Sequence, residues 1–83
     1  MNVEPLIRAI ISAMMLLEHS DPDEVDPDTA VKGMENMGHE LLKLNAGDRL
    51  AFLTVLEGIA ESENDGSVAD FVRSMPFMLG FAS

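Results

Sequence analysis

Three short polar breaks constrain this chain more than any other feature, because they leave only four segments long enough to form regular structure. The breaks lie at residues 20–25, 45–47 and 64–66 and combine Pro, Gly, Asp and Asn, which favour turns. Between the breaks, apolar residues recur at helical spacing, with no strand alternation and no internal repeat. We therefore predict an all-α fold, a compact bundle of about four short helices in a single domain over residues 1–83. The expected helices span roughly 4–19, 27–44, 48–63 and 68–75, and a short apolar segment follows at 76–81.

The first of these segments is the most apolar part of the chain. Within the stretch from Leu6 to Leu17 only Arg8 and Ser12 are polar, so apolar side chains cover nearly the whole circumference of the predicted helix. A helix of this kind is normally central in a core or buried in an oligomer interface. The stretch is too short to span a bilayer, and no cation precedes it as one would in a signal peptide. We therefore expect a cytoplasmic protein.

Capping residues predict where two of the other helices begin. Asp26 can cap the second helix, with Pro27 at its first position and Asp28 facing the positive end of the helix dipole. The fourth helix is preceded by a near match to the capping box at residues 67–70, with Asp in place of Glu or Gln. Pro76 should end or kink that helix.

Two features predict how the second and third helices pack. Gly38 lies on the apolar side of the second helix at a cost of about 1 kcal/mol in helix propensity, which indicates that a neighbouring helix approaches closely there. The expected core face of the third helix consists of Leu50, Phe52, Leu53, Leu56, Ile59 and Ala60. A stripe of small residues on another side would let a second helix pack tightly, and it consists of Ala51, Thr54, Gly58 and Ser62.

The C-terminal segment from Met75 to Phe81 is apolar at five of its seven positions. It either folds back as a lid over the core or stays exposed as a docking segment. We favour the lid, because small domains rarely leave that much apolar surface in water unless it binds something. Methionine is over-used on surfaces that adapt to partners, and Met15 and Met78 are the candidates for such an interface.

The chain is strongly acidic, with fifteen Asp and Glu against five Lys and Arg and a formal net charge of −10. The acids concentrate in two groups without a base, at residues 18–28 and 57–65. Such a charge disfavours direct binding to nucleic acid and attachment to an anionic membrane, and it favours a protein partner with a basic surface. Helix capping and solvation explain part of the charge. The candidate partner-binding residues are Asp21, Asp23, Glu24, Asp26, Asp28, Glu57, Glu61 and Glu63.

No arrangement of residues suited to catalysis or metal binding is complete in this sequence. A partial match to a calcium-binding loop begins at Glu61 and fails at its twelfth position, where Val72 replaces the required Glu. His19 and His39 belong to no cluster, and we expect the first to complement a helix dipole and the second to pair with Glu35. The chain has no cysteine, nucleophile elbow or phosphate-binding loop. We therefore expect no enzymatic activity, no cofactor and no metal.

An acidic, cysteine-free helical chain of this length resembles the small immunity proteins that bacteria make against toxins. The resemblance covers the whole chain as architecture and no part of it as a motif. Helical immunity proteins against nuclease colicins carry a Tyr pair on a short helix, and this sequence has no Tyr, so no residue is carried over. The resemblance implies an antitoxin-type inhibitor that binds and neutralises a cognate basic toxin or effector.

Two other functions fit the same composition. One is a homo-oligomeric structural or adaptor module, such as a homodimer, in which the apolar first helix and the small-residue stripe of the third bury against a second copy. The other is an acidic DNA mimic that inhibits a nucleic-acid enzyme.

Overall fold

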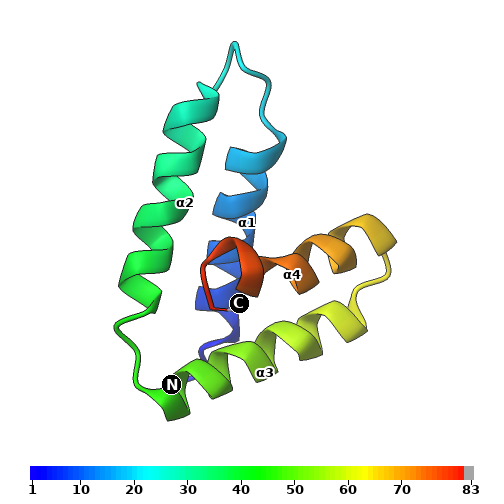
Figure 1. The fold of residues 1–83 in the computed structure, drawn as a ribbon. Helices are drawn as coiled ribbons and strands as arrows, with labels where there is room; N and C mark the ends of the chain where they lie inside the picture. Colours follow the sequence, from blue (N-terminus) through cyan, green and yellow to red (C-terminus); the bar gives the residue numbers. More distant parts are fainter. Residues whose placement is uncertain (82–83) are drawn as a thin grey trace.

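The computed structural model describes residues 1–81, and within them it confirms the all-α prediction. The helices are α1 (Glu4–His19), α2 (Pro27–Leu41), α3 (Ala46–Ser62) and α4 (Gly66–Met78), and the described part contains no strand. They form two hairpins, and the α3–α4 hairpin lies across one end of the α1–α2 hairpin (Figure 1). The radius of gyration is 12.8 Å, close to the value of about 12 Å expected for a compact chain of this length.

One apolar side of every helix contributes to a shared core. Met14 of α1 and Met75 of α4 are fully buried in this core. The second hairpin supplies most of the remaining core, with Phe52, Leu56, Ile59 and Ala60 from α3 and Ala69, Phe71 and Val72 from α4. The first hairpin adds Ile7 and Ile11 from α1 and Ala30, Met34 and Gly38 from α2.

The first helix is not central in this core, although its composition allowed that position. Ile7, Ile11 and Met14 are buried, but they lie on one side of α1. Leu6 and Leu16 are 53% and 63% exposed. The helix therefore packs on one side only and presents an apolar surface to solvent on the other.

The ends of α1 and the start of α2 agree with the local signals in the sequence. α1 runs from Glu4 to His19, as expected. Asp26 caps α2, because its carboxylate accepts a hydrogen bond from the backbone amide of Thr29 at 3.2 Å. Pro27 occupies the first helical position, as predicted.

The α2–α3 connection differs from the prediction, because α2 ends at Leu41 instead of residue 44 and α3 begins at Ala46 instead of residue 48. Arg49 of α3 explains the early end. Its guanidinium donates to the backbone carbonyl of Leu44 at 3.0 Å and also to that of Leu42, so these carbonyls are held by a side chain instead of a continuing helix. Asn45 caps α3 by accepting a hydrogen bond from the amide of residue 48 at 2.8 Å.

The capping box expected at the start of α4 is wrong, because Asp65 is the capping residue. Its Oδ1 accepts hydrogen bonds from the Ser67 hydroxyl at 2.7 Å, from the Ser67 amide at 2.9 Å and from the Val68 amide at 3.4 Å. These bonds satisfy amides that have no partner within the helix. The helix therefore begins at Gly66, and Asp70 has no capping role.

Pro76 does not end α4, because the helix continues beyond it to Met78. The actual stop is Gly80, which adopts a positive φ of 82°. Its amide donates to the Phe77 carbonyl at 3.1 Å, and the Phe81 amide donates to the Pro76 carbonyl at 2.7 Å. This pattern is a Schellman motif, which turns the chain back towards the core.

The segment after α4 forms the lid that the sequence favoured. Leu79 is 3% exposed, and the ring of Phe81 packs against Phe52 with 5.6 Å between ring centroids. A Cβ atom at Gly38 would lie 2.7 Å from the Leu79 carbonyl oxygen. The close approach predicted at Gly38 is therefore confirmed, although the neighbour is the backbone that ends α4. Phe77 is the exception to the lid, because it is 73% exposed.

Three residues differ from their predicted positions, and the small-residue stripe of α3 stays exposed within residues 1–81. Leu50 is 66% exposed and is not a core residue. The small residues of α3 are all exposed, and within residues 1–81 no helix packs over Gly58. Met15 and Met78 are half-buried against the core, so they do not form a free interface.

Candidate protein-binding site

Most of the basic side chains are already engaged within the molecule, so they leave the largest acidic group unneutralised. Three of the five form ion pairs, and Arg49 is held by backbone carbonyls. Lys32 forms neither an ion pair nor a side-chain hydrogen bond within residues 1–81. None of the ion pairs in the described chain involves an acid of the α1–α2 loop. The pairs are Arg8–Glu4 at 3.3 Å, Lys43–Glu40 at 3.0 Å and Arg73–Glu57 at 3.7 Å.

The α1–α2 loop holds three of its acids on an ordered turn. The Asp21 carbonyl accepts hydrogen bonds from the amides of Glu24 at 2.9 Å and Val25 at 3.0 Å. Val25 is half-buried, whereas Asp21, Asp23 and Glu24 are exposed. The loop lies at the free end of the first hairpin, at the top of Figure 1. The turn therefore presents three carboxylates outward at one end of the molecule.

The two remaining acids of this group are closer to α2 and have structural roles. Asp26 accepts hydrogen bonds from both the amide and the hydroxyl of Thr29, at 3.2 Å and 3.4 Å. Asp28 is exposed in the first turn of α2, where its negative charge interacts favourably with the helix dipole. Asp21, Asp23 and Glu24 are thus the loop acids most available to a partner.

The second acidic group is more engaged than the first. Glu57 pairs with Arg73 of α4, and Glu63 accepts a hydrogen bond from the Asp65 amide at 3.1 Å. Glu61 is exposed. Figure 1 places this end of α3 beside the α3–α4 turn and away from the α1–α2 loop. The structure therefore does not bring the two predicted acidic groups together into one surface.

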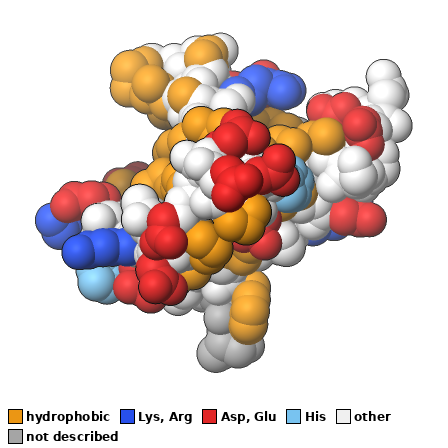
Figure 2. Space-filling view, turned by 90° about the horizontal axis from the view of Figure 1, so that it is seen from above, with side chains coloured by type: hydrophobic (Ala, Val, Ile, Leu, Met, Phe, Trp, Pro, Cys, Tyr) orange, Lys and Arg blue, Asp and Glu red, His pale blue; other side chains and the backbone are white. Residues whose placement is uncertain are grey.

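Figure 2 shows the end of the molecule that carries the α1–α2 loop. Acidic side chains gather near the middle of this face, with hydrophobic side chains between them, and the basic side chains lie towards its edges. A partner that meets this face would contact both negative charge and apolar surface. Such a mixture suits a protein better than a simple cation.

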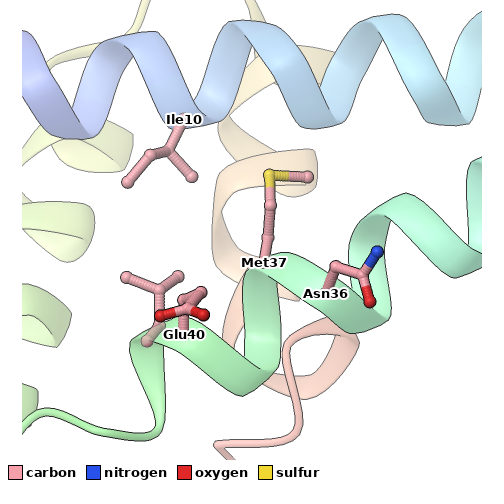
Figure 3. A pocket seen from close by; sticks show the side chains of 5 residues that line it. Ile10, Asn36, Met37 and Glu40 are labelled. Atoms are coloured by element: carbon pink, nitrogen blue, oxygen red, sulfur yellow. The ribbon is translucent and has the colours of Figure 1, made fainter.

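An apolar groove separates α1 from α2. A hollow of about 330 Å³ is lined by Ile10, Asn36, Met37, Glu40 and Leu41, and Figure 3 shows Ile10 and Met37 projecting into it from the two helices. A second hollow of about 270 Å³ shares Ile10 and Leu41 and extends to α3. The two hollows therefore lie next to each other along the boundary between α1 and α2.

The groove cannot be recognised from the sequence, because its residues repeat at the same spacing as true core residues. Met37, Leu41 and Leu44 follow the helical spacing of the buried Met34 and Gly38, yet each is only half-buried. Periodicity identifies the side of a helix that avoids water. It does not show how closely the neighbouring helix covers that side, so no signal in the sequence distinguishes the groove.

The histidines and the acids do not gather into a metal-binding cluster within residues 1–81. No three metal-ligating side chains come together in this part of the chain. The His19 ring meets the edge of Phe71, with 5.3 Å between ring centroids. His39 is exposed and makes no hydrogen bond or ion pair with Glu35 in the described structure, so that expected pair is not formed. No helix among these residues is both long and apolar enough to cross a bilayer.

No protein-family model, curated protein or solved structure gives a significant match to this chain. The small immunity proteins therefore remain a resemblance of length, charge and helical content. The function of the chain has to be inferred from its own surface.

Proposed function

We propose that this chain is a non-enzymatic protein-binding domain of the immunity or antitoxin type, which binds and neutralises a basic toxin or effector in the cytoplasm. The observation that carries the proposal is the α1–α2 loop. Asp21, Asp23 and Glu24 are exposed on an ordered turn, and within residues 1–81 no basic side chain forms an ion pair with them.

Surface charge increases the association rate of such a domain and its selectivity for a partner more than it increases the affinity. Electrostatic steering can raise association rates to about 10⁸–10⁹ M⁻¹s⁻¹ at low salt. Exposed ion pairs contribute only about 0–1 kcal/mol each, so tight binding also needs apolar contact. Hydrophobic side chains between the acids supply apolar surface for that contact.

The test measures binding kinetics against salt concentration, with the product of the adjacent gene as the partner. The loop variant carries Asp21→Asn, Asp23→Asn and Glu24→Gln. Its matched control also removes three negative charges, from exposed acids on three helices that are not candidate partner-binding residues: Glu35→Gln, Asp48→Asn and Asp70→Asn. The loop variant should associate about tenfold more slowly at low salt and lose much of its salt dependence, whereas the control should remain close to the wild type.

Equal association rates for the loop variant and the control would contradict the assignment of the site to this loop. Competition with duplex DNA for the bound partner then identifies how neutralisation works. Displacement of DNA by the wild-type chain indicates mimicry of a nucleic-acid substrate, whereas simultaneous binding indicates contact elsewhere on the toxin.

A further inference from the structure

The outward side of α1 is an apolar stripe without a charged residue. It consists of Leu6, Ala9, Ala13 and Leu16, all exposed, on the opposite side of the helix from the buried Ile7, Ile11 and Met14. The spacing of three, four and three residues matches the a and d positions of a heptad repeat, which form the seam between two packed helices. The stripe therefore has the pattern of a helix–helix contact whose second helix is missing.

The outer sides of the neighbouring helices do not share this character. Exposed residues of α2 include Lys32 and Glu35, and those of α3 include Glu57 and Glu61. Leu6 and Leu16 are 53% and 63% exposed, so each keeps more than half of its surface free within residues 1–81, although Leu6 also lines the hollow that extends to α3. The stripe is thus a distinct feature of α1 and not a general property of this surface.

The stripe can meet a second copy of itself in an antiparallel orientation. Its order of Leu, Ala, Ala and Leu is the same in both directions, with its midpoint between Ala9 and Ala13. An antiparallel copy therefore places Leu6 against Leu16 and Ala9 against Ala13, and the twofold axis repeats both contacts. An interface of this kind satisfies the rule that each patch in a twofold dimer meets its own copy. The small alanines allow the two helix axes to approach, while the leucines fill the ends.

The charge distribution selects the same orientation. A parallel pair would bring two acidic α1–α2 loops together at one end. An antiparallel pair separates them by about the length of α1, which is about 24 Å for 16 residues. That separation is well beyond the screening length of about 8 Å at physiological ionic strength, so the loops barely repel each other. The stripe itself carries no acid that would recognise a basic helix, which favours a second copy over a basic partner at this position.

We infer that this chain forms an antiparallel twofold dimer through Leu6, Ala9, Ala13 and Leu16 of α1. The dimer leaves both α1–α2 loops free, at opposite ends. It needs no other protein, so its failure in solution would leave the proposed function of the loop untouched.

Sedimentation equilibrium from micromolar to millimolar concentration tests the dimer. The wild type should approach twice the 9.0 kDa monomer mass as concentration rises. The Leu16→Glu variant should remain monomeric, because each of the two copies would place a charged side chain in the contact between the helices. Val31→Glu is the matched control, since Val31 is an exposed apolar residue of α2 at 55% exposure, and it should dimerise like the wild type. A wild type that stays monomeric throughout, or a Leu16→Glu variant that dimerises normally, would overturn the inference.

Cysteine cross-linking provides a second test that does not depend on a charge-introducing variant. The native chain has no cysteine, so Ala9→Cys and Ala13→Cys each introduce a single thiol. On oxidation with diamide, the antiparallel dimer predicts that a mixture of the two variants cross-links more than either variant alone. Stronger cross-linking of each variant with itself would indicate a parallel pair and overturn the orientation, and no cross-linking in any sample would overturn the dimer.

Discussion

The α3–α4 hairpin buries four residues from each of its helices, whereas the α1–α2 hairpin buries three from each and leaves an apolar groove between them. The difference does not come from composition, because α1 is the most apolar segment of the chain. It comes from position: α4 and the lid cover α3, while the outer side of α1 and the loop after it face water. An apolar helix therefore need not be a core helix in a molecule this small.

This division implies that the two hairpins should respond differently to mutation. Changes within the α3–α4 hairpin should reduce stability and leave partner binding intact in the folded fraction. Changes on the exposed parts of the α1–α2 hairpin should alter binding or self-association at little cost in stability. Paired variants, one from each hairpin, test the division directly.

The largest effect is expected for truncation of a buried methionine in α4. Met75→Ala should lower the free energy of unfolding by about 2–5 kcal/mol, because Met75 is completely buried and its loss leaves a cavity. Met37→Ala in α2 should cost about 1 kcal/mol, since Met37 lines the open groove and is already half in water. Urea unfolding followed by circular dichroism measures both. Equal losses would show that the groove is as well packed as the core.

A smaller loss is expected where the lid crosses α2. Gly38→Ala should destabilise the protein by about 1–3 kcal/mol, because the added methyl group would meet the Leu79 carbonyl oxygen at 2.7 Å. Gly58→Ala is the matched control in α3, where nothing lies within 4 Å. The control should stabilise the protein by about 0.5–1 kcal/mol through helix propensity alone. Thermal unfolding compares them, and a stabilising Gly38→Ala would show that the lid does not rest on α2.

The turn between the two hairpins should depend on Arg49. Arg49→Met removes two hydrogen bonds to the carbonyls of Leu42 and Leu44 while keeping most of the apolar stem, and should cost about 1–2 kcal/mol. Lys32→Met removes a positive charge that makes no such contact and should change the free energy of unfolding by less than about 0.5 kcal/mol. A similar effect for both variants would mean that net charge, and not the hydrogen bonds donated by Arg49, controls stability.

Local signals predicted much of the fold, and contacts between distant residues account for most of the errors. The bounds of α1 and the cap at Asp26 depend on residues within one turn, so they could be recognised. The early end of α2 depends on Arg49, seven residues after the carbonyl of Leu42 to which it donates. The cap at Asp65 was not predicted because Ser67, two residues later, is also a typical capping residue. In the folded turn Ser67 is a donor to Asp65, since both its amide and its hydroxyl donate to the Asp65 carboxylate.

The acidic residues of the candidate site could be predicted from the sequence, but the surface that they form in the folded protein could not. The acids of the α1–α2 loop were identified because they are adjacent in sequence. The engagement of Glu57 depends on Arg73, sixteen residues later on the next helix. The exposed side of α1 could not be deduced, because a helix that is apolar all round offers no polar side to mark the solvent.

The smallest expected effect is a pH dependence confined to the second hairpin, at the cap of α4. Hydrogen bonds from the Ser67 hydroxyl, and then from the Ser67 and Val68 amides, lower the pKa of Asp65 below its ordinary value of 3.8. A lowered pKa in the folded state means that the ionised carboxylate stabilises the fold above pH 3.8, and that this contribution is lost as the pH falls through the folded-state pKa.

Asp65→Asn keeps a hydrogen-bond acceptor and removes the charge. The wild type should therefore melt above Asp65→Asn at neutral pH, and the difference should vanish in acid. Ser67→Ala removes the largest cause of the shift, so in that variant the contribution of the charge should be smaller and its loss should be complete at a higher pH. A difference between the wild type and Asp65→Asn that persists unchanged in acid would mean that shape, and not charge, makes Asp65 the better cap.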